Sequence, residues 1–406
     1  MTEPKGDRGL AGPRPARHVV AARRVATAAF AGQGTAIAAV FTTIPVVKQH
    51  LGIGESLVTV MIVAVALMAG AGSFVGQAAV RALGPVVAMR FSLLLSAAAL
   101  VLLGRAPGTA VAIVAYLLFG LTVGSMDVCV NTRGASVERA YGRSVFASFY
   151  AAWSAGGIVA ALVTAGTNRL GWSAGSVLTA QAVVVAAFAP ALRAHRLPDA
   201  AGRGAGGPDR LRAGVWARLV RLGMVLMAVY VVDSTISSWC TVYLRQSLGA
   251  SLSAAPLAYA TYQAGTVAGR TLADRLVRRA GPAAVVRGAA PLTAAAVALL
   301  AGAPSWPYAV PAAGVAGLGL SVLIPLCLAA GGRLQPGATE AVLARLNVFN
   351  YVGLIVGSAA SGALGSGDRF RLAYAIAAAL ALALVASAPV FTARRGAALS
   401  PCSPPG

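Results

Sequence analysis

Twelve stretches of about twenty apolar residues follow one another along the chain, and they constrain its fold more than any other feature. A helix rises about 1.5 Å per residue, so about twenty residues cross the hydrocarbon core of a bilayer. The stretches are continuous rather than alternating, and in lipid only helices or closed barrels satisfy their backbone hydrogen bonds. We therefore predict an all-α integral membrane protein with transmembrane helices over roughly 25–47, 56–80, 85–104, 108–131, 144–167, 173–192, 222–244, 254–275, 282–303, 307–331, 340–364 and 371–391.

Charged residues make up only 11% of the chain, too few to cover the surface of a soluble protein of this length. The net charge of +22 would suit a nucleic-acid partner in a soluble protein, so its placement matters. With the N-terminus inside, 27 of the 33 Lys and Arg residues fall on inner segments and 6 on outer loops. This bias predicts two cytoplasmic termini and excludes nucleic acid as a partner. Arginine greatly outnumbers lysine, which is typical of bacteria with GC-rich codons, so we expect a bacterial inner membrane.

The chain repeats itself at a constant offset of 197 residues. Gly120 in the fourth stretch corresponds to Gly317 in the tenth, and Gly156 in the fifth corresponds to Gly353 in the eleventh. The connections after the second and eighth stretches also match, with Gly72, Arg81, Gly84, Pro85 and Arg90 corresponding to Gly269, Arg278, Gly281, Pro282 and Arg287. An even number of crossings precedes the second copy, so the two halves are parallel and related by an axis along the membrane normal.

This repeat predicts two pseudo-symmetric bundles of six helices each. We expect a cytoplasmic N-terminal tail over 1–24, the first bundle over 25–192 and the second over 222–391. A polar, arginine-rich cytoplasmic linker over 193–221 joins them, and a cytoplasmic tail over 392–406 ends the chain.

The connection after the eighth stretch carries a charged motif made of Gly269, Asp274, Arg275, Arg278, Arg279 and Gly281. This motif resembles the cytoplasmic loop signature of the major facilitator superfamily. Other segments are similar, more narrowly, to YbjJ-type proteins and fucose-permease-like proton symporters; they are centred on Ile44-Pro45, Asp127 to Asn131, Trp153 to Gly156, and Asp233 to Tyr243. Three positions depart from that pattern: Gln77 replaces the acid of the loop signature, Thr43 an arginine and Tyr150 a histidine.

The resemblance implies a major facilitator fold and secondary transport of a small molecule by alternating access. It favours proton-coupled uptake, or symport, of a sugar-like polar solute. Proton antiport that exports a metabolite or drug is the alternative. A sensor or assembly protein that keeps the fold without transport is the alternative from another class. Partners are then the solute, the proton and the lipid bilayer, and we expect a monomer.

An enzyme is not expected from these residues. The three histidines, His18, His50 and His195, all fall in tails, loops or ends of stretches. Carboxylates and cysteines show no metal-ligand spacing, and no phosphate-binding loop is present. The sequence therefore predicts no catalytic residue, no cofactor and no metal site.

Asp127 and Asp233 are the only acids that we place inside the membrane and outside the loop motif. Ionisable groups in a bilayer are costly and mark functional positions. Low-dielectric surroundings disfavour the charged carboxylate, so such a group can load a proton on one side and release it on the other. We predict that both residues couple proton binding to transport. For Asp127, pairing with Arg133 or a position at the interface is the alternative.

Polar and aromatic residues inside the stretches are candidates for lining the substrate cavity. They are Gln33, Thr43, Asn131, Tyr150, Trp153, Trp239, Tyr262, Gln263, Asn347, Asn350 and Tyr351. Such groups also pack or hydrogen-bond from helix to helix without touching a solute, so each has a structural alternative. The resemblance further implies an inner gate made of Asp274, Arg275, Arg278 and Arg279, with a solvated loop face as the alternative.

Overall fold

The structure is a computed structural model that describes residues 16–142, 145–193, 212–335, 338–365 and 369–391. The tail predicted over 392–406 and most of the linker predicted over 193–221 lie outside these residues. Every regular element of the described chain is a helix, as the apolar stretches predict. The all-helical prediction is confirmed.

The first half contributes six long helices. They are α1 (Arg17–Leu51), α2 (Glu55–Leu83), α3 (Pro85–Gly104), α4 (Thr109–Tyr141), α5 (Phe146–Arg169) and α6 (Ala174–Ala186), which is followed by the 3-10 helix η1 (Ala189–Ala191). The second half contributes α7 (Ala213–Gln246), α8 (Pro256–Ala280), α9 (Pro282–Gly302), α10 (Trp306–Leu320), α11 (Leu323–Gly332), α12 (Thr339–Gly365) and α13 (Phe370–Ala383), which continues as the 3-10 helix η3 (Leu384–Phe391). α10 and α11 together make one crossing, so the two halves make twelve.

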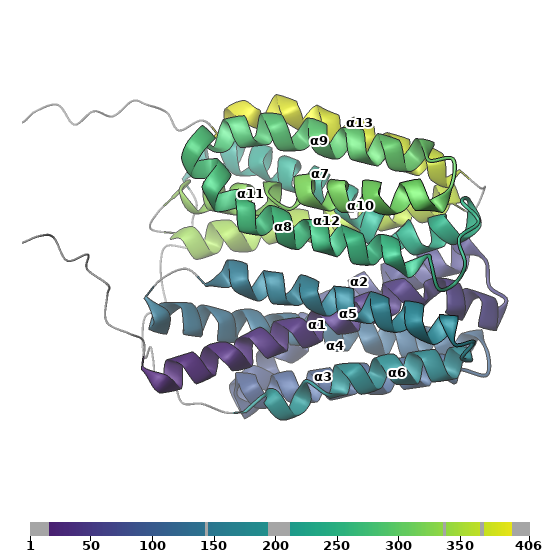
Figure 1. The fold of residues 1–406 in the computed structure, drawn as a ribbon. Coiled ribbons are helices and arrows are strands. Elements are labelled where there is room, and N and C mark those ends of the chain that lie inside the picture. Colours follow the sequence, from purple (N-terminus) through teal and green to yellow (C-terminus); the bar gives the residue numbers. More distant parts are fainter. Residues whose placement is uncertain (1–15, 143–144, 194–211, 336–337, 366–368, 392–406) are drawn as a thin grey trace, which may run out of the picture.

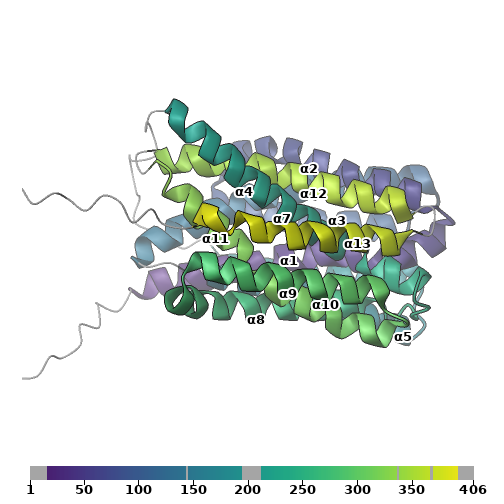
Figure 2. The same ribbon diagram turned by 90° about the horizontal axis from the view of Figure 1, so that it is seen from above.

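Eleven of these crossings in the described chain are long and apolar enough to span a membrane by composition alone. The remaining crossing is α8, whose second half contains four arginines, Arg270, Arg275, Arg278 and Arg279. Figure 1 shows α1 to α6 and α7 to α13 as two bundles whose helices run side by side, and Figure 2 shows them from above. The twelve-helix fold is thus built from two halves of equal crossing number.

Several helices start or break at other positions than predicted. α1 begins at Arg17 and α7 at Ala213, so both extend into segments predicted as tail and linker. The tenth crossing, predicted as one helix over 307–331, is interrupted at residues 321–322. Pro325 explains the break, because its ring clashes with the carbonyl of the residue four positions earlier and removes a helical hydrogen bond. Other helices accommodate a proline without a break, for example α9 with Pro291.

The internal repeat is visible in the backbone. Gly84 and Gly281 both adopt φ 78° and ψ 158°, a conformation that residues with a Cβ rarely take. Each glycine is followed by a proline at the first position of the next helix, where the missing N–H costs nothing. The same Gly-Pro turn therefore joins α2 to α3 and α8 to α9.

The matched glycines also do the same packing in both halves. A methyl group at Gly72 would overlap the carbonyl oxygen of Leu121, and one at Gly269 would overlap that of Leu318. Glycines at these positions let α2 approach α4, and α8 approach α10, closely enough for backbone contact. Between the bundles, α5 packs against α8 and α2 against α12.

Candidate functional site

Asp127 lies near the middle of α4 and holds hydrogen bonds to both bundles. Gln33 of α1 donates from Nε2 to its Oδ1 at 3.2 Å. Tyr351 of α12, in the second bundle, donates from its hydroxyl to Oδ2 at 3.5 Å. Asn131, one turn further along α4, donates to the Asp127 backbone carbonyl at 2.9 Å. The carboxyl group is thus surrounded by neutral donors, and Arg133 is not its recorded hydrogen-bond partner.

Asp233 lies near the middle of α7, in the second bundle. The hydroxyl of Tyr262, on the neighbouring helix α8, donates a short hydrogen bond to its Oδ1. The ion pair that the structure records within its described ranges is Lys48–Glu55, so neither Asp127 nor Asp233 is in contact with a cation. Two partly buried carboxyl groups, one per bundle, are therefore held by neutral side chains.

Arg270 of α8 is a functional candidate that we did not predict. Its Nη1 donates to the backbone carbonyl of Tyr150 at 2.8 Å and to Ser154 Oγ at 3.0 Å, both in α5 of the first bundle. The guanidinium also lies over the Tyr150 ring, 5.6 Å from its centroid. Arg270 therefore links the two bundles from within the membrane-spanning part of α8, ten residues before Ala280, or about 15 Å along the helix.

These groups form one cluster rather than separate sites. Arg270 interacts electrostatically with Asp233 without touching it, and Tyr230 of α7 interacts electrostatically with Asp127, Asp233, Arg270 and Tyr150. We call Asp127, Asp233, Arg270 and the tyrosines Tyr150, Tyr230, Tyr262 and Tyr351 the central polar cluster. Its members come from both bundles, which the Arg270–Tyr150 and Tyr351–Asp127 hydrogen bonds join.

Arg270 falls inside the stretch predicted over 254–275, but we did not name it as a site residue. A signal was present: Gln263, which we predicted to line the cavity, precedes Arg270 by seven residues, which puts the two on one face of a helix. We overlooked this shared face because Arg270 directly follows Gly269, the first residue of the loop signature. At the matching position of the first half stands Ser73, so the cation belongs to one half alone.

Not every predicted cavity residue joins the central polar cluster. The hydroxyl of Thr43 is buried and bonds the carbonyl of Ala39 in its own helix at 2.6 Å. Trp239 is buried, donates to the backbone carbonyl of Ser358 at 2.9 Å and packs against Phe370. Both residues therefore make the helix-packing contacts that are the alternative to lining a cavity.

The other predicted cavity residues have mixed surroundings. Gln263 is buried and donates to the hydroxyl of Tyr259 at 2.9 Å. Asn350 donates to Asn347 at 3.2 Å within α12. Trp153 is partly buried, and its backbone carbonyl packs against Gly34 of α1. A role for these residues in binding a solute remains a prediction.

The inner gate also remains a prediction. Arg275, Arg278 and Arg279 are exposed on the last turns of α8. The side chain of Asp274 lies outside the described part of the structure. Within that part, no three His, Cys, Asp or Glu residues are grouped as metal ligands.

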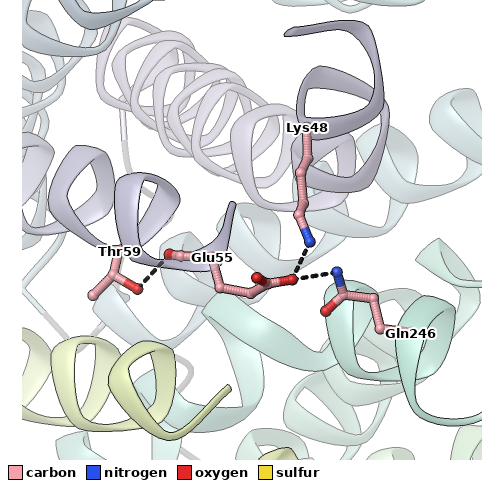
Figure 3. Close-up of polar contacts among 4 residues, drawn as sticks. All are labelled: Lys48, Glu55, Thr59 and Gln246. Carbon is pink, nitrogen blue, oxygen red and sulfur yellow. Dashed lines mark hydrogen bonds and ion pairs between the residues drawn. The ribbon is translucent and has the colours of Figure 1, made fainter. Parts of the chain in front are cut away.

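At the end of the bundles that carries the α1–α2 connection, which we call the far end, hydrogen bonds join the two bundles. Thr241 donates to the carbonyl of Phe41 at 2.8 Å, and Asn168 donates to that of Leu252 at 3.3 Å. Figure 3 shows a third contact: Gln246 of α7 donates to Glu55 of α2 at 2.6 Å, while Lys48 pairs with the same carboxylate. The bundles are therefore tied together at the far end.

Replacing Gln246 with alanine should loosen the far end. One exposed hydrogen bond to a charged group is lost, which contributes about 0.5–1.5 kcal/mol, or roughly a factor of 2–10 in a two-state equilibrium. Spin labels at Gly54 and Ser251, on the two connections, would report a larger population of long distances. Thr59→Val is the control, because Thr59 bonds only the backbone carbonyl of Glu55 in the same helix. An unchanged distance distribution in Gln246→Ala would contradict the role of this contact.

The model of the Major Facilitator Superfamily matches residues 222–401. The structure superimposes on a mutant of the nucleoside transporter NupG with a TM-score of 0.70 and 12% identity, covering 93% of this chain and 100% of that one. It has the major facilitator fold. An inward-facing bacterial homologue of the human lysosomal transporter Spinster gives a TM-score of 0.67 at 13% identity, covering 94% and 98% of the two chains.

Three known proteins are similar to this chain in sequence over most of its length. An uncharacterized MFS-type transporter of Yersinia pestis is 27% identical over 372 residues, covering 90% of this chain and 94% of that protein. An uncharacterized transporter of Sinorhizobium fredii, y4wD, is 29% identical over 306 residues, 71% of this chain and 76% of that protein. The membrane protein MosC of Rhizobium meliloti is 26% identical over 329 residues, 80% of this chain and 79% of that protein. Two of these relatives are named as transporters and the third as a membrane protein.

Proposed function

We propose that this major facilitator protein is a proton-coupled secondary transporter that moves a small polar solute by alternating access, with Asp127 and Asp233 as the proton-carrying groups. Uptake by symport across a bacterial inner membrane, with both termini cytoplasmic, is the form that the arginine distribution and the resemblance favour. The observation that carries the proposal is the hydrogen bond from Tyr351 to Asp127, which joins the two bundles at a carboxyl group.

A carboxyl group in this position can connect protonation to movement. Its ionised form accepts hydrogen bonds strongly, whereas protonation weakens it as an acceptor and removes its charge. Protonation would first weaken the Tyr351 contact and let α4 and α12 move relative to each other. The neutral carboxyl is then tolerated when the rearranged bundles close into a dry interface. Asp233 and Tyr262, both in the second bundle, provide a second such pair.

The two carboxyl groups must be neutralised by something other than a contacting cation. Within the described ranges neither of them forms an ion pair. An uncompensated charge in a low-dielectric interior is costly, and a bound proton removes that cost. Protons are therefore the natural partners of both residues during the transport cycle.

Reconstituted liposomes test this proposal. A panel of radiolabelled polar solutes would be offered to liposomes with an acidic exterior, with and without an ionophore that collapses the proton gradient. We expect ionophore-sensitive accumulation of at least one solute. Gradient-driven loss of solute from loaded liposomes would indicate the antiport alternative. Binding without any flux in either direction would contradict transport and indicate the sensor or assembly role.

A further inference from the structure

Arg270 is the charged member of the central polar cluster that the proposed proton cycle leaves uncompensated. Protons neutralise Asp127 and Asp233, but an arginine stays protonated at any physiological pH. When both carboxyl groups carry protons, the cluster holds one net positive charge between two bundles that must close around the solute. A closed interior with an unpaired cation is unfavourable unless the solute supplies the opposite charge.

The guanidinium of Arg270 has donors left for a ligand. It carries five N–H groups in a planar fork. The recorded hydrogen bonds use Nη1 alone, directed to Tyr150 and Ser154 of α5. Within the described residues, Nη2 and Nε donate no hydrogen bond. They are not among the unpaired polar atoms that the protein shields from solvent, so a ligand can reach them. The hydrogen bonds from Nη1 to α5 hold the guanidinium in place and leave its Nη2 and Nε edge free for a ligand.

The surroundings of that free edge suit an oxyanion. Two N–H groups of a guanidinium match the two oxygens of a carboxylate in a bidentate pair. Asp233 is near but is held by Tyr262, so it does not occupy the fork.

We infer that the transported solute is a small organic anion whose carboxylate, or a similar oxyanion group, binds Arg270. This inference rests on the proposed transport function and names the class of its substrate. It narrows the sugar-like expectation, since a sugar acid satisfies both the resemblance and the cation. With the anion on Arg270 and protons on Asp127 and Asp233, the loaded cluster is electrically neutral.

Matched pairs of acids and neutral analogues test the inference by binding alone. The pairs are glucuronate with glucose, gluconate with sorbitol, and lactate with lactamide, each titrated against purified protein by thermal shift and calorimetry. We expect at least one acid to bind about tenfold or more tightly than its neutral partner, the discrimination of a single charge-assisted bidentate contact. Equal binding of acid and neutral partners, or no binding by any acid, would overturn the inference.

Variants of Arg270 assign the preference to this side chain. Arg270→Gln should bring the acid and its neutral partner to within about threefold of each other, whereas Arg270→Lys should keep part of the preference, because it keeps charge without the fork. A full preference in Arg270→Gln would overturn the assignment. If Arg270→Gln does not fold into a monodisperse protein, the test is made with two other measurements. These are the acid preference of the wild-type protein and the reduced preference expected of Arg270→Lys.

The binding test and the flux test can contradict the two proposals independently of each other. Binding needs no proton gradient, so a clear acid preference without proton-driven flux would overturn the proposed coupling and leave the anion inference standing. Proton-driven accumulation of a neutral solute, unaffected by Arg270→Gln, would overturn the anion inference and leave the transport function standing.

Discussion

Replacing Asp233 with asparagine is expected to lower proton-driven accumulation of the solute by about tenfold per unit of pH difference while sparing solute exchange. Asparagine keeps the size of the side chain and an acceptor for Tyr262, but it carries no titratable proton. One coupled proton corresponds to about tenfold accumulation per unit of pH difference, because one unit is about 1.4 kcal/mol. The accumulation ratio in Asp233→Asn liposomes should therefore fall by that factor, because only the proton on Asp127 is still coupled, while counterflow of labelled solute against unlabelled solute continues.

Thr43→Val is the matched control for that experiment. Thr43 is also a polar residue of a membrane helix and was predicted to line the cavity, but its hydroxyl bonds Ala39 of its own helix. Accumulation by this variant should remain close to that of the unmodified protein. Full accumulation by Asp233→Asn would remove Asp233 from the coupling role, and loss of exchange together with accumulation would indicate a folding or binding defect instead.

The second large effect concerns the stability of the bundles. A methyl group at Gly124 of α4 would overlap the backbone carbonyl of Ala69 in α2, and one at Gly265 of α8 would overlap that of Gly314 in α10. Backbone atoms cannot move aside without shifting a helix, and overpacking of this kind costs about 1–3 kcal/mol. Gly124→Ala and Gly265→Ala should each lower the apparent melting temperature in detergent by several degrees.

Gly288→Ala is the control, a glycine-to-alanine change at a helix position with free space, and it should not lower the melting temperature. Gly288 lies inside α9, and no atom stands within 4 Å of the place that its Cβ would take. Alanine is favoured over glycine in a helix interior by about 0.5–1 kcal/mol, so this variant should melt at the same temperature or slightly higher. Similar melting curves for all three variants would show that the close helix approach is not what limits stability.

The membrane fold could be predicted because its determinants are local. A stretch of about twenty apolar residues spans a bilayer whatever lies beside it. The fixed offset between the halves is equally a property of the chain alone. It correctly paired Gly72 with Gly269, which pack against neighbouring helices in the same way. The break at residues 321–322 was also readable from Pro325, although Pro291 leaves α9 intact, so packing decides whether a proline interrupts a helix.

The acids of the central polar cluster were found for the same reason. A carboxyl group inside an apolar stretch is conspicuous without knowledge of its neighbours, because its burial is costly anywhere in lipid. Asp127 and Asp233 were therefore named from the residues, whereas the hydrogen bond from Tyr351 to Asp127 joins positions 224 residues apart. No local pattern predicts such a contact.

The sequence by itself thus determined an all-helical chain of twelve crossings in two similar halves, with two acids inside apolar stretches. Only the tertiary structure decided which faces of the helices meet. The hydroxyl of Thr43 bonds its own helix, Trp239 bonds Ser358 within the second bundle, and Arg270 of α8 reaches α5 of the first bundle. The physical reason is that hydropathy depends on composition along one helix, whereas the rotation of a helix is set by the neighbours against which it packs.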